Sequence, residues 1–205
     1  MDKIVIIGYS GHSYVVNSIF TSVNQQVFAY CDSTEKTLNP FSLEYLGKET
    51  DQKALDILKA NSFFIAIGDN KIRRKIYENL LNNYHISPIN AVHKNSVICS
   101  TAKIDEGNIM IGAGVIINPL AIINKGVICN TGSILEHECI IESFAHIGPG
   151  AILCGNVHIG ENTFVGAGSV IRQGIKIGNN VMIGAGSVVV KDVPDNMTVM
   201  GCPAK

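Results

Sequence analysis

The sequence predicts an α/β domain with a small parallel sheet, followed by a long parallel β-helix. Three observations predict this fold class. Aliphatic residues recur at every sixth position through the C-terminal half, and a second column of small or β-branched residues follows four positions after each of them. The first 85 residues lack this period and alternate short apolar runs with segments of helical spacing. We therefore expect two domains, 1–90 and 91–205.

In the N-terminal region, short apolar runs predict strands, and apolar residues at helical spacing predict helices. The expected order is strand 3–8, helix 12–22, strand 27–31, helix 52–59, strand 63–68 and helix 69–82. Residues 33–50 look irregular. Asp69 or Asn70 is expected to cap the last helix. The inner face of that helix is expected to carry Ile72, Ile76, Leu80 and Leu81. Alternating strands and helices predict a small parallel sheet.

Ligands of such a sheet are expected at the carboxyl ends of its strands. The Gly-rich turn Gly8–Ser13 follows the first strand and opens a helix, so its backbone N–H groups can bind a phosphate. Asp32 ends the second strand and Gly68 ends the third. Ser10 and Ser13 stand where a dinucleotide motif has glycines, which favours nucleotide binding over a nicotinamide redox role. A turn needed only for helix–strand packing is the alternative.

The six-residue period matches short strands joined by tight turns rather than a helix. The aliphatic column comprises Ile111, Ile117, Ile123, Cys129, Leu135, Ile141, Ile147, Leu153, Ile159, Val165, Ile171, Ile177, Ile183 and Val189. With three hexads per triangular coil, residues about 18 apart should stack in neighbouring coils. Residues 97–110 are expected to begin a further coil. The spacing leaves the hand of the coil open, because parallel crossovers are normally right-handed.

The composition excludes several classes of function. A net charge of −1 gives no strong attraction for nucleic acid or an anionic membrane. No run approaches about 18 apolar residues, and the first residues read as a strand rather than a signal peptide. The six cysteines include no C-x-x-C pair, and Cys129 and Cys139 occupy core columns, which predicts reduced, buried thiols. We expect a cytoplasmic protein that binds neither nucleic acid nor a membrane.

Chemistry is expected from outward-facing residues that break the repeat. His137 is the third residue of the hexad Leu135–Ile140 and is flanked by Glu136 and Glu138. A carboxylate beside an imidazole raises its basicity and fixes its tautomer, as a general base requires. Glu138 can reach His137 only if this segment is a corner, and the middle of a hexad is where a corner is expected. A solvated surface histidine is the alternative.

A zinc site is a rival interpretation of the histidines. His137 and His158 fall on the same predicted face, but their spacing exceeds one coil by three residues. That offset corresponds to about 10 Å along a strand, which is too far for shared ligation within one chain. We therefore expect no bound metal.

Four segments carry a resemblance to a known family. They are Gly8–His12, Phe63–Gly68, Asn130–Cys139 and Val199–Lys205. On these segments the chain resembles the hexapeptide-repeat acyltransferases, and most of all the UDP-4-amino-sugar N-acetyltransferases that make UDP-N,N′-diacetylbacillosamine. Sialic acid O-acetyltransferases and GDP-perosamine N-acetyltransferases share this architecture. The resemblance implies a Rossmann-like N-terminal domain, a left-handed β-helix, and a homotrimer with coenzyme A between adjacent solenoids.

The resemblance also implies roles for single residues. It makes His137 the catalytic base and Glu138 its carboxylate partner. It implies acetyl-CoA contacts at His146, Ala167 and Ala185, and UDP-sugar contacts at Ser10, Gly11, His12, Asp32 and Gly68. Asn130 matches an asparagine near the acceptor sugar. Ser33 stands where relatives have a second acid, and the loop 34–60 is longer than theirs, so the nucleotide and the sugar stay open.

We therefore expect an enzyme that transfers acetyl from acetyl-CoA to the amine of a nucleotide-linked amino sugar, of the UDP-4-amino-4,6-dideoxy type. Direct attack with a histidine base is expected, and a backbone N–H would stabilise the oxyanion. The first alternative is O-acetylation of sialic acid or a related sugar. The second is a non-catalytic, trimeric scaffold that binds nucleotide sugars, although a scaffold does not need an imidazole between carboxylates.

Overall fold

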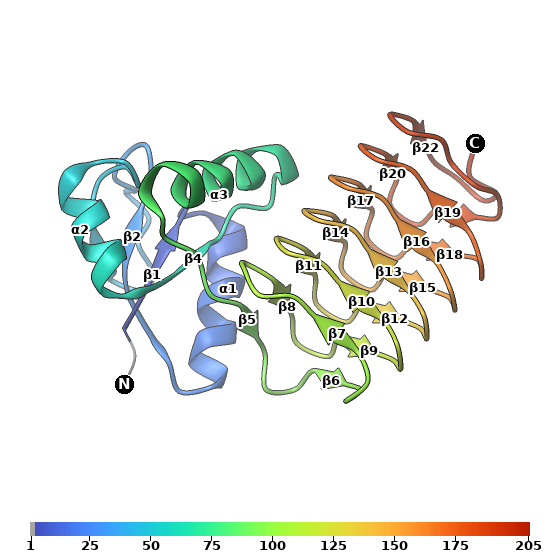
Figure 1. The fold of residues 1–205 in the computed structure, drawn as a ribbon, viewed down its shortest axis with the longest axis horizontal. Helices are drawn as coiled ribbons and strands as arrows, with labels where there is room; N and C mark the ends of the chain where they lie inside the picture. The colour runs from blue at the N-terminus through green and yellow to red at the C-terminus, as the bar shows by residue number, and fades with distance from the viewer. Residues whose placement is uncertain (1–2) are drawn as a thin grey trace.

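The computed structural model describes residues 3–205 as an α/β domain joined to a triangular solenoid (Figure 1). The elements of the α/β domain are β1 (Lys3–Ile7), α1 (Gly11–Ser22), β2 (Gln26–Cys31), β3 (Glu44–Tyr45), α2 (Gln52–Ala60), β4 (Ser62–Ile65) and α3 (Asn70–Tyr84). The four strands form one sheet in the order β3-β2-β1-β4, and every pairing is parallel. The predicted order of strands and helices is confirmed.

Two boundaries differ from the sequence prediction. The segment 33–50, expected to be irregular, contains β3, which is too short to give an apolar pattern and adds to the edge of the sheet beside Ala29 and Tyr30. The apolar run at 63–68 is a strand only as far as Ile65. Its last residues form the loop that enters α3, and this loop carries Gly68 into the site described below.

The predicted inner face of α3 is partly wrong. Ile72 is 52% exposed, whereas the buried residues of this helix are Asn70, Arg73, Tyr77 and Leu80. The physical reason is that the first turn of α3 packs on backbone carbonyls of the solenoid rather than on an apolar surface. The side chains of α3 that face the solenoid are therefore the hydrogen-bond donors Asn70 and Arg73 rather than Ile72.

The solenoid has three flat faces, numbered here in the order in which the chain passes them in each coil. Face 1 consists of β5 (Ala91–Val92), β8 (Met110–Ile111), β11 (Ile128–Cys129), β14 (His146–Ile147), β17 (Phe164–Val165), β20 (Met182–Ile183) and β22 (Thr198–Val199). Face 2 consists of β6 (Val97–Ile98), β9 (Ile116–Ile117), β12 (Ile134–Leu135), β15 (Ile152–Leu153), β18 (Val170–Ile171) and β21 (Val188–Val189). Face 3 consists of β7 (Lys103–Ile104), β10 (Ile122–Ile123), β13 (Ile140–Ile141), β16 (His158–Ile159) and β19 (Lys176–Ile177).

Each strand pairs in parallel with the strand one coil later, as Ile122 pairs with Ile140, so the predicted stacking is confirmed. The second residue of each strand points inward, and these residues with the small column fill one continuous core. The first coil begins at Ala91 rather than at residue 97. The solenoid is a left-handed β-helix of hexapeptide repeats, as the resemblance implied. All six cysteines are free thiols.

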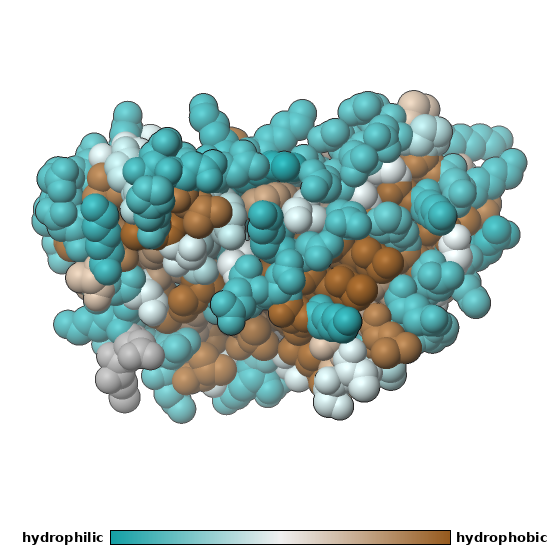
Figure 2. Space-filling view, in the orientation of Figure 1, coloured by the Kyte–Doolittle hydropathy of each residue, from teal (hydrophilic) through white to brown (hydrophobic). Residues whose placement is uncertain are grey.

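The three faces differ in what covers their outward residues. On face 1, Ala91, Met110 and Ile128 are buried in one cluster with residues of β1 and α1, so the α/β domain sits on the first coils. On face 2 every outward residue is aliphatic and not fully buried: Val97, Ile116, Ile134, Ile152, Val170 and Val188. Face 3 is apolar only over its middle coils, around β10 and β13 (Figure 2), where Ile122 and Ile140 are paired.

None of the helices within residues 3–205 is both long and apolar enough to span a membrane.

Candidate active site

His137 and Glu138 lie in the turn between β12 and β13, at the corner between faces 2 and 3. Glu138 adopts a left-handed backbone with φ of 61°, so the two neighbouring side chains can meet there. His137 Nδ1 lies 3.0 Å from Glu138 Oε2, and about half of each side chain is exposed. Because the Glu138 carboxylate can only accept a hydrogen bond, Nδ1 of His137 carries the hydrogen and its Nε2 presents a lone pair. That arrangement suits a general base.

Gly155, which the sequence analysis did not single out, provides the space for this imidazole. It occupies the same corner one coil later, and a Cβ built on it would lie 2.5 Å from both Cε1 and Nε2 of His137. Its φ lies outside the left-handed region, so the side chain of His137, not the backbone conformation, requires a glycine here. Glycines are frequent at these corners, which hid this one in the sequence.

A second cluster lies at the corner between faces 1 and 2. His146 is buried on face 1 with 6% exposure, and its Nε2 lies 3.2 Å from Asn130 Nδ2. Ala167 and Ala185 stand in the turns of the next two coils at the same corner. These turns stack closely, since a Cβ on Gly166 would lie 2.5 Å from the backbone nitrogen of Ala185. The three predicted acetyl-CoA residues and Asn130 therefore follow one edge of the solenoid.

His146 also contributes to a cavity of about 660 Å³ between the two domains. Its other wall includes His12 and Gly68, and its floor on face 1 includes Phe164 and Met182. The rings of His12 and His146 lie 6.1 Å apart. Burial, and then the positive charge of Arg73, lower the pKa of His12 to about 4 and that of His146 to about 3. Both imidazoles are therefore neutral at physiological pH.

These two histidines should make the fold sensitive to mild acid. In the unfolded chain both histidines become protonated below about pH 6.5, whereas in the folded chain His12 stays neutral until about pH 4 and His146 until about pH 3. Stability is complete above pH 6.5 and should fall by about 1.4 kcal/mol per pH unit for each histidine as the pH drops toward 4. Urea midpoints at pH 7.5, 6.5 and 5 measure this. A flat profile between pH 6.5 and 5 would contradict it, and His12→Gln should reduce the slope.

A separate cavity of about 680 Å³ lies at the carboxyl ends of β1, β2 and β4. The turn Gly8–Ser10, Asp32, Lys36, Lys48 and Gly68 are among its lining residues. Gly11 follows that turn and stays open, since a Cβ added to it would have no neighbouring atom within 4 Å. Ser10, Gly11 and Gly68 thus lie where the sequence predicts a phosphate-binding helix N-terminus. His12 faces the interdomain cavity instead, so Gly68 separates the two spaces.

The carboxylate of Asp32 is fixed by hydrogen bonds and an ion pair within the protein. Its Oδ2 accepts from the Tyr9 backbone N–H at 2.9 Å, and its Oδ1 pairs with Lys36 Nζ at 2.9 Å. Burial alone would raise the pKa of Asp32, but the bonds from Lys36, Tyr9 and Ser33 outweigh it and lower the pKa. Asp32 therefore fixes the Gly-rich turn and presents Lys36 beside the cavity.

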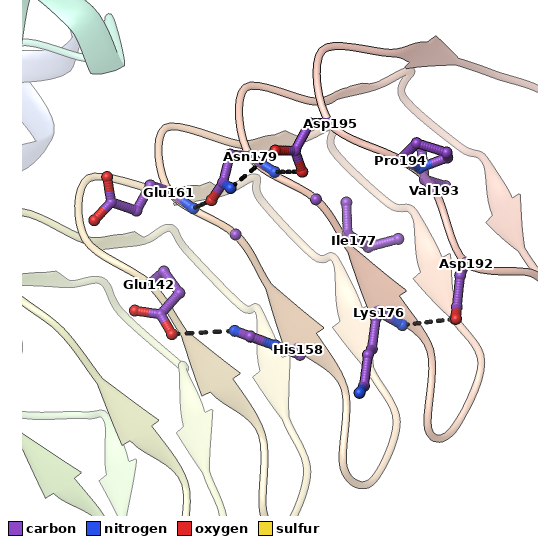
Figure 3. A pocket seen from close by; sticks show the side chains of 12 residues that line it. Glu142, His158, Glu161, Lys176, Ile177, Asn179, Asp192, Val193, Pro194 and Asp195 are labelled. Atoms are coloured by element: carbon purple, nitrogen blue, oxygen red, sulfur yellow. Dashed lines mark hydrogen bonds and ion pairs between the residues drawn. The ribbon is translucent and has the colours of Figure 1, made fainter.

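A groove of about 640 Å³ on face 3 gathers several acidic residues and His158 (Figure 3). His158 Nε2 lies 3.1 Å from Glu142 Oε1, and Asp195 accepts from the side chain and backbone of Asn179. Within residues 3–205, no group of three His, Cys, Asp or Glu side chains is arranged to hold a metal ion. The prediction that His137 and His158 share a face is wrong, because His137 lies at a corner and His158 lies on the flat strand β16.

Comparison with known proteins first gives the class. The sequence profile of the PglD N-terminal domain matches residues 3–80. The profile described as bacterial transferase hexapeptide (six repeats) matches residues 138–173 and 156–191. The chain is thus a hexapeptide-repeat transferase with a PglD-type N-terminal domain.

Solved structures then give the family. PerB from Caulobacter crescentus, in complex with CoA and GDP-perosamine, is 33% identical over 100% of this chain and 97% of its own, with a TM-score of 0.90. The acetyltransferase domain of PglB from Neisseria gonorrhoeae, in complex with acetyl coenzyme A, is 30% identical over 100% and 98%, with a TM-score of 0.89. WeeI from Acinetobacter baumannii is 26% identical over 98% of both chains, with a TM-score of 0.80. The chain belongs to the hexapeptide-repeat sugar acetyltransferases.

Proposed function

We propose that this protein transfers acetyl from acetyl-CoA to the amine of a nucleotide-linked amino sugar, with a UDP-4-amino-4,6-dideoxy sugar as the substrate type. The observation that carries the proposal is the exposed His137–Glu138 pair with a free Nε2. Two similar structures contain CoA or acetyl coenzyme A, and one of these also contains a nucleotide-linked amino sugar. Because acetyl-CoA is a cytoplasmic metabolite, the reaction is expected in the cytoplasm.

The proposed chemistry is a direct transfer. The amine nitrogen attacks the acetyl carbonyl, an N–C bond forms, and the C–S bond of the thioester breaks. His137 Nε2 takes the proton from the amine and returns it to the departing thiolate sulfur, while Glu138 stabilises the imidazolium. The nucleotide diphosphate is assigned to the N-terminus of α1 at Ser10 and Gly11. The Ser10 backbone N–H already donates to Ser13 Oγ at 2.8 Å, so we expect Gly11 rather than Ser10 to offer a backbone N–H to the phosphate.

The active site requires more than one copy of the chain. The α/β domain covers face 1, whereas His137 lies at the corner between faces 2 and 3, which is the edge opposite face 1. Ala167 and Ala185 lie in turns at the corner between faces 1 and 2, and His146, on β14 of face 1, contacts Asn130 of that corner. The width of face 2 therefore separates the proposed base from the proposed acetyl-CoA edge within one chain.

A homotrimer would bring His137 of one copy close to the acetyl-CoA edge of the next. The aliphatic residues of face 2 suit a shared three-fold axis, because three triangular prisms can turn the same flat face toward it. Each prism then meets its neighbours along the two edges of that face. The edge of one copy that carries His137 meets the edge of the next that carries His146. We propose three such sites per trimer.

An acetylation assay tests the substrate. One preparation is incubated with acetyl-CoA and, in separate reactions, a UDP-4-amino-4,6-dideoxy sugar, GDP-perosamine and free sialic acid. Release of the CoA thiol gives the rate, and mass spectrometry identifies the product. N-acetylation of a nucleotide-linked sugar supports the proposal. Acetylation of sialic acid alone would establish the O-acetyltransferase alternative, and no acetylation of any acceptor would favour a binding protein.

Gly155→Ala tests the position of the proposed base. The added methyl group would occupy the space of the His137 ring, so the imidazole must rotate away from its place. Because the backbone tolerates alanine there, the melting temperature should change little, whereas turnover should fall about 10²-fold. Steady-state kinetics and a melting curve measure both. Wild-type turnover in this variant would show that the base need not sit against Gly155.

A further inference from the structure

Arg73, in the first turn of α3, is fully buried between the two domains. Its guanidinium donates five hydrogen bonds, four to backbone carbonyls and one to Asn70 Oδ1, at 2.9 to 3.1 Å. None of the ion pairs within residues 3–205 includes it. A buried charge is costly unless all its donors are satisfied. Each of its three nitrogens donates here, and so many directed bonds permit one position only.

One side of the Arg73 guanidinium forms hydrogen bonds to the solenoid. Its Nε donates to Gly126 O and one terminal nitrogen donates to Phe144 O. Asn70, on the same helical turn, donates to Asn162 O. These three acceptors occupy the same corner, between faces 3 and 1, of three consecutive coils, and all have left-handed φ values between 55° and 70°. A column of corner carbonyls therefore sets the height of α3 along the solenoid.

The other side of Arg73 holds the loop after β4. One terminal nitrogen donates to both Ile67 O and Gly68 O at 3.1 Å. Gly68 lines the proposed nucleotide cavity and the interdomain cavity alike. His146 Nδ1 lies 3.3 Å from the same carbonyl, Gly68 O. Gly68 O therefore contacts both Arg73 and His146, and it connects the loop after β4 with a residue proposed to bind acetyl-CoA.

The hydrogen bonds around His146 determine its tautomer. Asn130 Oδ1 accepts from the Thr131 backbone N–H at 2.8 Å, so the amide nitrogen of Asn130 faces His146 Nε2. Nε2 must then accept, and Nδ1 carries the hydrogen and donates to Gly68 O. A neutral ring is the one form that satisfies both contacts.

We propose that Arg73 is a positioning residue for acetyl transfer, which holds the Gly68 loop at a fixed height on the solenoid and, through Gly68 O, keeps the hydrogen of His146 on Nδ1. This inference rests on the proposed function. It means that the nucleotide sugar and the acetyl donor are brought into register by a residue that touches neither. Arg73 acts through a carbonyl that the two sites share.

Kinetics of Arg73→Lys and Arg73→Met provide the first test. Lysine keeps the charge but cannot reach both the corner carbonyls and Gly68 O, and methionine keeps the length without charge. We expect kcat to fall about 10²-fold with the nucleotide-sugar acceptor in both variants, with little change in the KM for acetyl-CoA. The matched control is Arg74→Met, since Arg74 pairs with the partly exposed Glu78 and Glu161 and should behave as wild type. Unchanged kcat in folded Arg73 variants would overturn the proposal.

The histidine tautomer provides a test that does not depend on activity. In wild-type protein labelled with ¹⁵N-histidine, His146 should show a neutral ring with hydrogen on Nδ1 from pH 5 to 8. His146→Gln identifies its signals. In Arg73→Lys we expect loss of the single fixed tautomer. A wild-type His146 that titrates in this range, or carries its hydrogen on Nε2, would overturn the inference even if no Arg73 variant folds, and would leave the role of His137 untouched.

Discussion

His137→Ala should lower the turnover number for acetyl transfer by about 10²–10⁴-fold, the usual contribution of a general base. The side chain is about half exposed and hydrogen-bonds to Glu138, its neighbour in the sequence, so the fold loses little when it is removed. The melting temperature and the oligomeric state should therefore match those of the wild type. Loss of turnover at a constant KM for acetyl-CoA is the pattern expected when an interaction made in the transition state disappears.

A matched control is present on the same solenoid. His158 also pairs with a glutamate, Glu142, at 3.1 Å, but it lies on face 3 rather than at an edge of face 2. His158→Ala removes an equivalent histidine–carboxylate pair and should leave turnover unchanged. Wild-type turnover in His137→Ala, or an equal loss in both variants, would reject His137 as the base. Glu138→Gln should give a smaller loss than His137→Ala, because the base itself is retained.

The repeat made the solenoid predictable because its signal is local. Each inward aliphatic residue such as Ile141 repeats one geometric requirement, and many repeats leave a single consistent register. The pairing of His137 with Glu138 was also accessible from the sequence, since the two residues are adjacent and the hexad position predicts a corner. These features need no knowledge of distant contacts.

The parts that sequence analysis missed depend on contacts across the chain. Helical spacing predicted α3 but assigned Ile72 to its inner face, because apolar periodicity assumes an apolar partner. The real partner is a column of carbonyls, which Arg73 meets through contacts 53 and 71 residues apart in sequence. Gly155 was hidden for a related reason, since a glycine that makes room for a side chain looks the same as a glycine that forms a turn.

Ile134→Glu should convert the proposed trimer to monomers and abolish acetyl transfer. Ile134 lies in the middle of face 2, between Ile116 and Ile152, and its side chain points away from the solenoid core. At a three-fold axis the substitution would bring three carboxylates together in an apolar contact, at a cost of several kcal/mol, about 3 or more. In a monomer the same carboxylate is solvated, so the chain should stay folded. Light scattering gives the mass, and circular dichroism reports the fold.

The same substitution on another face provides the control. Ile122→Glu lies on face 3 beside Lys103 and should leave both mass and activity unchanged. A trimeric Ile134→Glu protein would mean that face 2 is not the interface. A monomeric but fully active protein would mean that one chain holds a complete site, and the proposed sharing would be wrong.

Mixed trimers separate loss of assembly from loss of a shared site. His137→Ala removes the base from one edge, and Ala185→Trp, at an exposed corner, should block the acetyl-CoA edge. Each variant alone should be inactive. If a site takes His137 from one copy and Ala185 from the next, co-expression in equal amounts should restore roughly one quarter of wild-type activity, because one in four neighbouring pairs joins the two intact edges. If both edges of a site came from one chain, no mixture could restore activity, so recovery in mixed trimers depends directly on the geometry of face 2.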